Sequence, residues 1–137
     1  MFSAEYSLFG TLLTGTTVPV KSCMVHEDDY YTHIKKAAER LDWNYYRLET
    51  RGKDGMADML VTRREEYWFI EVKRLKKAKL RTIEDDLQWQ YGQLAFLKRC
   101  FRNKTRYMLV VVKERFALYL KENSDEVPDY PDFIECV

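Results

Sequence analysis

The chain has 137 residues, of which 46% are hydrophobic and 33% are charged, and its formal net charge is +1. This length suits one domain with its own core, and no run approaches the ~20 apolar residues needed to cross a membrane. The N-terminus lacks the basic start and apolar stretch of a signal peptide. Three cysteines, Cys23, Cys100 and Cys136, form neither a metal-ligand spacing nor an even disulfide framework. We therefore expect reduced thiols and a cytoplasmic protein, bacterial or from a virus-infected host cell, with a nuclear location left open.

The first half of the chain is expected to hold an arm, a helix and three strands. Residues 1–22 are apolar and rich in threonine, and they form either a hairpin or an extended arm. Tyr31, Ile34 and Ala38 recur at helical spacing, which predicts a helix over 27–41. Short runs rich in β-branched and aromatic residues then predict strands at about 44–49, 57–63 and 67–73.

The second half is expected to hold a long helix over 83–101 and a strand over 107–113. The run Met-Leu-Val-Val-Val in that strand is typical of a strand buried on both faces. Residues 116–120 would form a final edge strand. A strand, a helix and another buried strand make a right-handed crossover, so 107–113 should lie parallel to a strand of the preceding hairpin. The predicted fold class is α/β, with the order αβββαβ and a mixed central sheet flanked by helices.

Two carboxylates and an ammonium stand at a spacing that would bring them together. Asp58 ends the run Gly-Met-Ala-Asp, and Glu71-Val72-Lys73 follows after twelve residues. An antiparallel hairpin centred between positions 64 and 65 pairs residues whose numbers sum to 129, so Asp58 faces Glu71 with Cβ atoms ~4.5–5.5 Å apart. Lys73 shares their face because side chains alternate along a strand. Facing carboxylates favour a divalent cation between them; the alternative is a solvent-facing row in which Lys73 offsets Glu71.

Gly-x-x-Asp followed by Glu-x-Lys on the next strand resembles the PD-(D/E)xK nuclease superfamily, most closely its VRR-NUC domains and small Holliday-junction resolvases. The resemblance runs from about 26 to 121, and Ala57 stands where the family often has proline. It implies a restriction-endonuclease-like core over 23–121, between the N-terminal arm and an acidic tail over 122–137. It also implies Mg²⁺ or Mn²⁺ held by Asp58, Glu71 and the Val72 carbonyl, with Lys73 positioning the attacking water.

Further site residues are expected on the two helices. Glu27 opens the first helix on its inward face, and the resemblance implies a fourth metal ligand there; an acid in a first turn also favours the helix macrodipole. His26 is a less favoured ligand, by analogy with relatives that cleave RNA. Gln90 best matches the glutamine that approaches the site lysine in related nucleases, with Gln88 and Gln93 as alternatives.

Charge is distributed unevenly along the chain. Residues 122–137 hold six acids and no lysine or arginine. Without these six of its 22 acids, the body over 1–121 has 23 basic and 16 acidic residues, a net of +7. The tail would be a disordered end, a protein-docking segment or a strap across the basic groove. The residues expected to contact nucleic acid are Arg51, Lys53, Arg74, Lys76, Lys77, Lys79 and Arg81.

These features together predict a divalent-metal-dependent DNA endonuclease. So small a chain has no spare domain for reading sequence, which favours cleavage of branched or Holliday-junction DNA by a homodimer. One alternative is a degenerate nuclease fold that binds nucleic acid or a protein partner without cutting, and the acidic tail would suit such a partner. The other alternative is the same chemistry on RNA.

Overall fold

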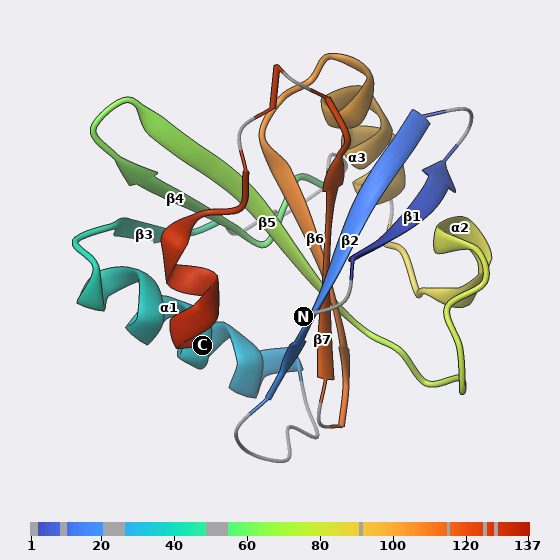
Figure 1. Ribbon diagram of the computed structural model, residues 1–137, viewed down its shortest axis with the longest axis horizontal. Helices are drawn as coiled ribbons and strands as arrows, with labels where there is room; N and C mark the ends of the chain where they lie inside the picture. The colour runs from blue at the N-terminus through green and yellow to red at the C-terminus, as the bar shows by residue number, and fades with distance from the viewer. Residues whose placement is uncertain are drawn as a thin grey trace.

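A computed structural model of the chain shows a single seven-stranded sheet with helices on both sides (Figure 1). It describes residues 3–8, 11–20, 27–48, 55–90, 92–114, 116–124, 126–127 and 129–137, without the side chains of 3–5 and 27–28. The strands are β1 (Ser3–Leu8), β2 (Thr11–Pro19), β3 (Asn44–Arg47), β4 (Met59–Arg63), β5 (Glu66–Arg74), β6 (Tyr107–Lys113) and β7 (Phe116–Glu122). The helices are α1 (Glu27–Arg40), α2 (Ile83–Asp86), α3 (Gln93–Arg102) and the 3₁₀ helix η1 (Asp132–Cys136).

The strand order is β1-β2-β7-β6-β5-β4-β3, and β5 and β6 are its parallel pair. The α/β class, the mixed sheet and the parallel placement of β6 were predicted and are confirmed. The prediction of a final edge strand over 116–120 is wrong, because β7 lies inside the sheet between β6 and β2. Within the predicted arm, β1 and β2 pair as an antiparallel hairpin that extends the sheet, since β2 also pairs with β7 along seven positions.

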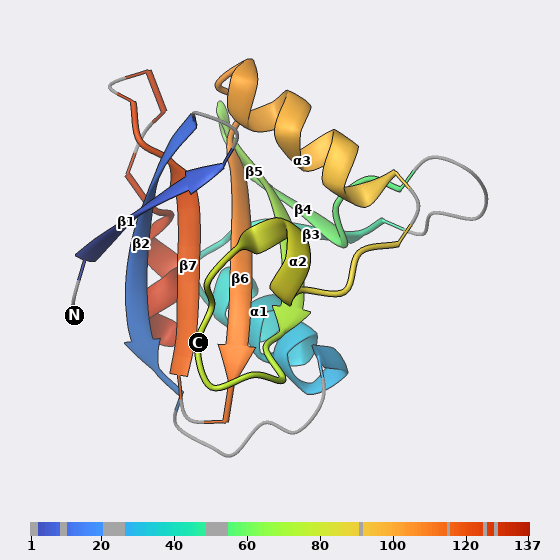
Figure 2. The same cartoon turned by 90° about the vertical axis from the view of Figure 1, so that its right-hand side faces the viewer.

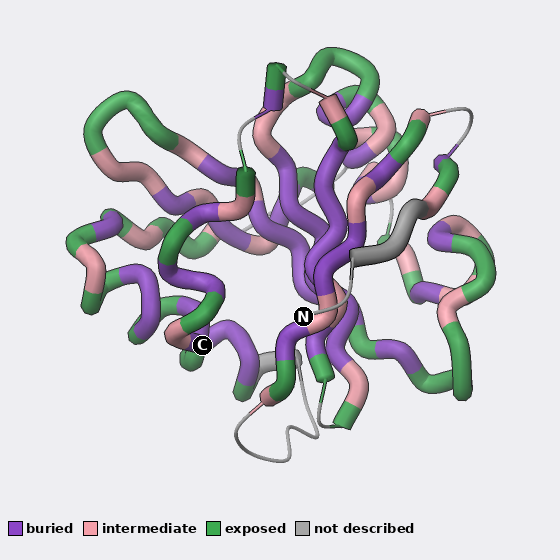
Figure 3. Tube along the Cα trace, viewed as in Figure 1, coloured by how far each residue is buried: buried purple, intermediate pink, exposed green. Residues whose placement is uncertain are grey.

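Each face of the sheet has its own buried core, and the centre of the molecule is buried throughout (Figure 3). On one face, Tyr30 and Ile34 of α1 pack with Trp68 of β5. On the other face, Leu97 and Phe101 of α3 pack with residues of β5 and β6. This division follows from the alternation of side chains along each strand. None of the helices in the described ranges is long and apolar enough to cross a membrane.

The helix predicted over 83–101 is two helices joined by a loop. Helix α2 ends because Leu87 takes an extended conformation, with φ of −113° and ψ of 148°. The Asp86 carboxylate accepts hydrogen bonds from the backbone amides of Arg81 and Thr82 at the start of α2, at 2.7 and 3.1 Å. Gly92 then takes a left-handed conformation with φ of 81° immediately before α3, a geometry that glycine adopts without strain. The helical spacing of apolar residues continues across the break, which is why the periodicity predicted one helix instead of two.

The C-terminal segment belongs to the α1 side of the sheet. Phe133 and Ile134 of η1 are buried in the core that α1 covers, and the Phe133 ring meets Trp43 edge-on at 5.4 Å between centroids. Asp132 accepts hydrogen bonds from Trp43 Nε1 and Arg63 at 2.9 Å each. The basic segment over 74–81 leads to α2 on the other side (Figure 2). The predictions of a disordered end and of a strap over the basic residues are therefore wrong for 129–137.

We expect Phe133→Ala to lower the free energy of unfolding by about 3–5 kcal/mol, because it empties a fully buried ring site. Chemical denaturation followed by tryptophan fluorescence measures this change. Glu135→Ala in the same segment is the control, since Glu135 is exposed and its loss should change stability by about 0.5 kcal/mol at most. Equal midpoints for both variants would show that the segment does not support the core.

Candidate active site

The hairpin of β4 and β5 has the register that the sequence predicted. Met59 pairs with Ile70 and Leu60 with Phe69, so the numbers of each pair sum to 129. Asp58 stands one residue before β4 and continues this register toward Glu71. The predicted strand began two residues too early at 57, but the Asp58 and Glu71 side chains are close enough for a hydrogen bond between them.

Asp58 is held by three elements. Its Oδ2 accepts a hydrogen bond from the Tyr31 hydroxyl of α1 at 2.7 Å and one from the Val72 amide of β5 at 2.9 Å. Its backbone carbonyl accepts from the Leu48 amide at 2.9 Å. The Arg47 guanidinium lies 3.8 Å from the centroid of the Tyr31 ring and contributes a positive charge near Asp58. Asp58 is therefore fixed in place before any ligand arrives.

Glu71 is a carboxyl group buried at 1% exposure on the same side of the sheet. Its Oε1 lies 3.4 Å from Lys73 Nζ, while its buried Oε2 has no hydrogen-bond donor among the described residues. Burial, the charge of Asp58 and a side-chain hydrogen bond to Asp58 raise the pKa of Glu71 from 4.5 to about 9, although Lys73 opposes the shift. Glu71 therefore holds a proton at neutral pH unless a cation replaces it.

Lys73 is also buried, at 6% exposure, and its ammonium is oriented by α3 and the loop before it. Nζ donates a 2.7 Å hydrogen bond to Gln93 Oε1 and lies 5.1 Å from the centroid of the Trp89 ring. Gln93 Oε1 accepts a second hydrogen bond, from the Gln90 amide, at 2.9 Å. The prediction of Gln90 as the glutamine beside the lysine is wrong: Gln90 lies in the α2–α3 loop with its side chain exposed, and Gln93 takes that position.

Two tyrosines near the carboxylates were missed as site residues. Tyr31 was predicted only as part of an apolar stripe, yet its hydroxyl holds Asp58. Tyr107 of β6 is fully buried, and burial together with the charges of Glu71 and Asp58 raises the pKa of its hydroxyl well above the usual range. A buried tyrosine usually needs a polar partner for its hydroxyl, and this requirement could have indicated Tyr31, whereas the Tyr107 hydroxyl has no hydrogen-bond partner among the described residues.

The basic segment follows β5 and is tied to the sheet. Lys113 Nζ donates hydrogen bonds to the carbonyls of Lys77 and Ala78 at 2.9 and 2.8 Å. Lys77 pairs with Asp86 at 2.9 Å, so part of its charge is already offset. Five of the predicted nucleic-acid contacts have exposed side chains here: Arg74, Lys76, Lys77, Lys79 and Arg81.

Other predicted site residues fall outside what the structure describes. Glu27 begins α1, but its side chain is not among the described ones, and His26, Arg51 and Lys53 lie in the undescribed ranges. Within the described part of the chain, no three His, Cys, Asp or Glu side chains gather as a metal group. Comparison with protein-family models, curated proteins and solved structures found no match.

We expect Glu71→Gln to stabilise the metal-free protein, by an amount that grows from pH 5 to pH 9. The raised pKa of Glu71 means that its contribution to stability is present below about pH 4.5 and is lost as the pH rises through about 9. The neutral amide of the variant does not titrate, so the variant keeps this stability as the pH rises. Thermal unfolding in EDTA at pH 5, 7 and 9 measures the difference in stability between variant and wild type, with Glu65→Gln in the exposed turn as control. A difference that does not change with pH would contradict the assignment.

Proposed function

We propose that the protein is a divalent-metal-dependent nuclease that hydrolyses phosphodiester bonds in DNA. The supporting observation is the buried Glu71 carboxyl, which faces Asp58 and has an oxygen without a hydrogen-bond partner among the described residues. Facing carboxylates repel each other when both are charged, which is why Glu71 holds a proton in the metal-free protein. A divalent cation would replace that proton and allow both acids to be charged.

The residues fit a hard divalent cation such as Mg²⁺ or Mn²⁺, which prefers oxygen ligands. The hydrogen bonds from Tyr31 and Val72 both end on Asp58 Oδ2, and we assign Oδ1 as the ligand oxygen. Glu71 would contribute Oε2. The Val72 backbone adjoins both acids, and its carbonyl is the third proposed ligand. Glu27 remains proposed as a fourth.

Each polar residue has a distinct part in the proposed reaction. When bound, the metal would supply Lewis-acid chemistry to the scissile phosphate. Lys73 would orient the attacking water or stabilise negative charge that develops on the phosphate. Its ammonium is held by Gln93, so it would need little rearrangement. Arg74, Lys76, Lys79 and Arg81 would contact the backbone without reading sequence.

The arrangement of the elements also supports a restriction-endonuclease-like core. Helix α1, the strands β3 to β5, the helical segment α2–α3 and strand β6 follow the αβββαβ order, with β6 parallel to β5. We propose that the protein acts on branched DNA as a homodimer, because a second copy would present a second site to a second strand.

Asp58→Asn should reduce cleavage in Mn²⁺ at least ~100-fold, because it removes a ligand charge while keeping the shape of the side chain. The measurement compares the rates at which linear, single-stranded, flap and four-way DNA are cleaved. The control is Asp85→Asn, at an exposed position of α2. Calorimetric titration of Mn²⁺ should lose its binding signal in the Asp58→Asn variant.

Cleavage that survives Asp58→Asn or EDTA would contradict the assigned site. A wild-type protein that binds DNA but shows no metal site would favour the non-cutting binding module. Parallel digestion of matched DNA and RNA distinguishes the two substrates.

Gln93→Ala should lower the cleavage rate by about 10–100-fold, the usual effect of losing a residue that orients a functional group. Gln90→Ala should cost far less, because the contact of Gln90 with Gln93 is made by its backbone amide. Gln93→Glu keeps an acceptor oxygen for Lys73 and should restore much of the rate. Equal losses in the Gln93→Ala and Gln90→Ala proteins, or equal losses in the Ala and Glu variants at 93, would exclude this positioning role.

A further inference from the structure

The two sides of the sheet carry opposite charge. Residues 87–113, which include α3 and β6, contain six basic residues and no acid. The other side holds α1, with four acidic and three basic residues, and η1, with two acidic residues. The basic segment over 74–81, α3, and α2 with its three acids lie on the first side (Figure 2). A polyanion would therefore meet a more favourable potential on the α3 side.

Helix α3 is fixed relative to the proposed site. Gln93 in its first turn holds Lys73 Nζ, so the helix starts at the site and runs away from it. From Gln93 to Arg102 the helix rises ~14 Å. This length corresponds to about four nucleotide steps along one strand of a duplex. The helix is therefore long enough to follow a bound strand away from the cleaved bond.

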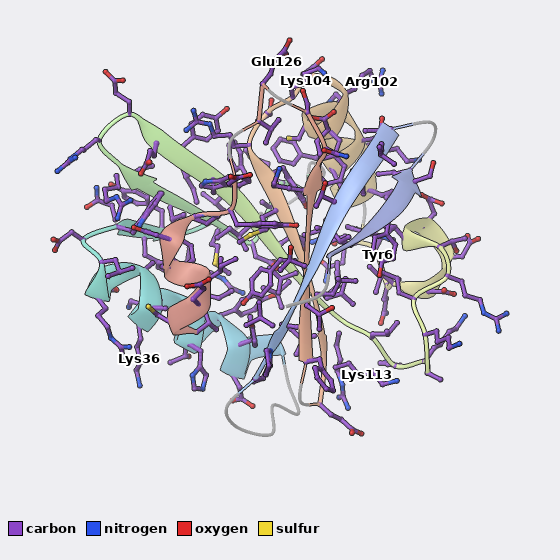
Figure 4. All side chains as sticks on the ribbon, viewed as in Figure 1. Tyr6, Lys36, Arg102, Lys104, Lys113 and Glu126 are labelled. Atoms are coloured by element: carbon purple, nitrogen blue, oxygen red, sulfur yellow. The ribbon has the colours of Figure 1, made fainter. Side chains whose placement is uncertain are left out.

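Two cations of α3 stand at a cleft that faces the N-terminal hairpin. Lys98 and Arg102 are one turn apart and line a space of about 360 Å³ together with Phe101, Leu8 and Thr11. A phosphate bound in this cleft would be attracted to both cations. Figure 4 shows Arg102 at the outer end of α3, far from Lys36 on α1.

Two acids on this side are offset by a lysine. Asp86 of α2 is paired with Lys77, and Glu122 of β7 is buried 3.9 Å from Lys104 Nζ. Glu84 and Asp85 of α2 add negative charge, and so does the exposed Glu126, which lies near Lys104 (Figure 4). The acids of this side therefore offset only part of the positive potential along α3.

We propose that α3 is a second nucleic-acid-binding surface, in which Lys98 and Arg102 bind backbone phosphates. This surface and the basic segment over 74–81 lie on the same side of the sheet, with the proposed site between them. This inference rests on the proposed action on nucleic acid. It adds a surface that the sequence did not indicate, because Lys98 and Arg102 become a site only when α3 packs beside the hairpin. The predicted contacts all lay within 51–81.

Helix α1 offers a matched control. Lys36 and Arg40 are also one turn apart, exposed and near the C-terminal end of their helix. The double variants K98Q/R102Q and K36Q/R40Q remove the same charge from equivalent helix positions. Thermal unfolding of both should stay close to wild type, which separates effects on binding from effects on folding.

The experiment measures fluorescence anisotropy of a labelled forked duplex in EDTA, between 50 and 200 mM salt. The slope of log K against log salt is negative, and each lost phosphate contact should make it shallower by about 0.9. K98Q/R102Q should therefore make the slope shallower by about 1.8, and K36Q/R40Q should leave it unchanged. An unchanged slope for K98Q/R102Q, an equal loss for K36Q/R40Q, or no binding by the wild type would overturn the proposal.

A separate digestion with Mn²⁺ distinguishes this inference from the nuclease proposal. A wild type that binds through α3 but never cleaves supports the surface and contradicts the nuclease. If the wild type cleaves DNA but K98Q/R102Q does not change the slope of log K against log salt, only the α3 surface is contradicted.

Discussion

The register of the β4–β5 hairpin is the constraint on which the candidate site depends. The Val72 amide donates to Asp58 Oδ2, and this bond sets Asp58 against Glu71 just beyond the paired residues of β4. A slip of one residue would turn each side chain of one strand to the opposite face. Asp58 would then lose Glu71 as its partner, and Lys73 would lose the acceptor on Gln93.

The buried polar groups around this hairpin form one connected network. Tyr31 of α1 bonds Asp58, Glu71 pairs with Lys73, and Lys73 bonds Gln93 of α3. The network thus connects the helices on the two faces of the sheet. Buried charges are costly unless they are paired, so Glu71, with one oxygen lacking a partner in the described structure, is the point where the network is incomplete. The proposed metal would complete it.

The end of the acidic segment and the basic segment lie on different sides of the sheet. Residues 129–137 pack with α1 and Trp43, so Asp132 and Glu135 lie on the α1 side, whereas Glu122 lies beside Lys104. This arrangement explains how a chain with a net charge of only +1 can present a basic side. Net charge alone would have given little reason to expect a polyanion as the partner.

The sequence by itself determined the strand register, the parallel β6 and the set Asp58, Glu71 and Lys73, because alternation and pairing are local and repeat at fixed spacing. Only the tertiary structure decided that Gln93 holds Lys73, that Tyr31 holds Asp58 and that β7 lies inside the sheet. The reason is physical: the extended Leu87 and the left-handed Gly92 break a helix whose apolar spacing continues without interruption. Contacts between elements far apart in the chain depend on packing, which periodicity does not encode.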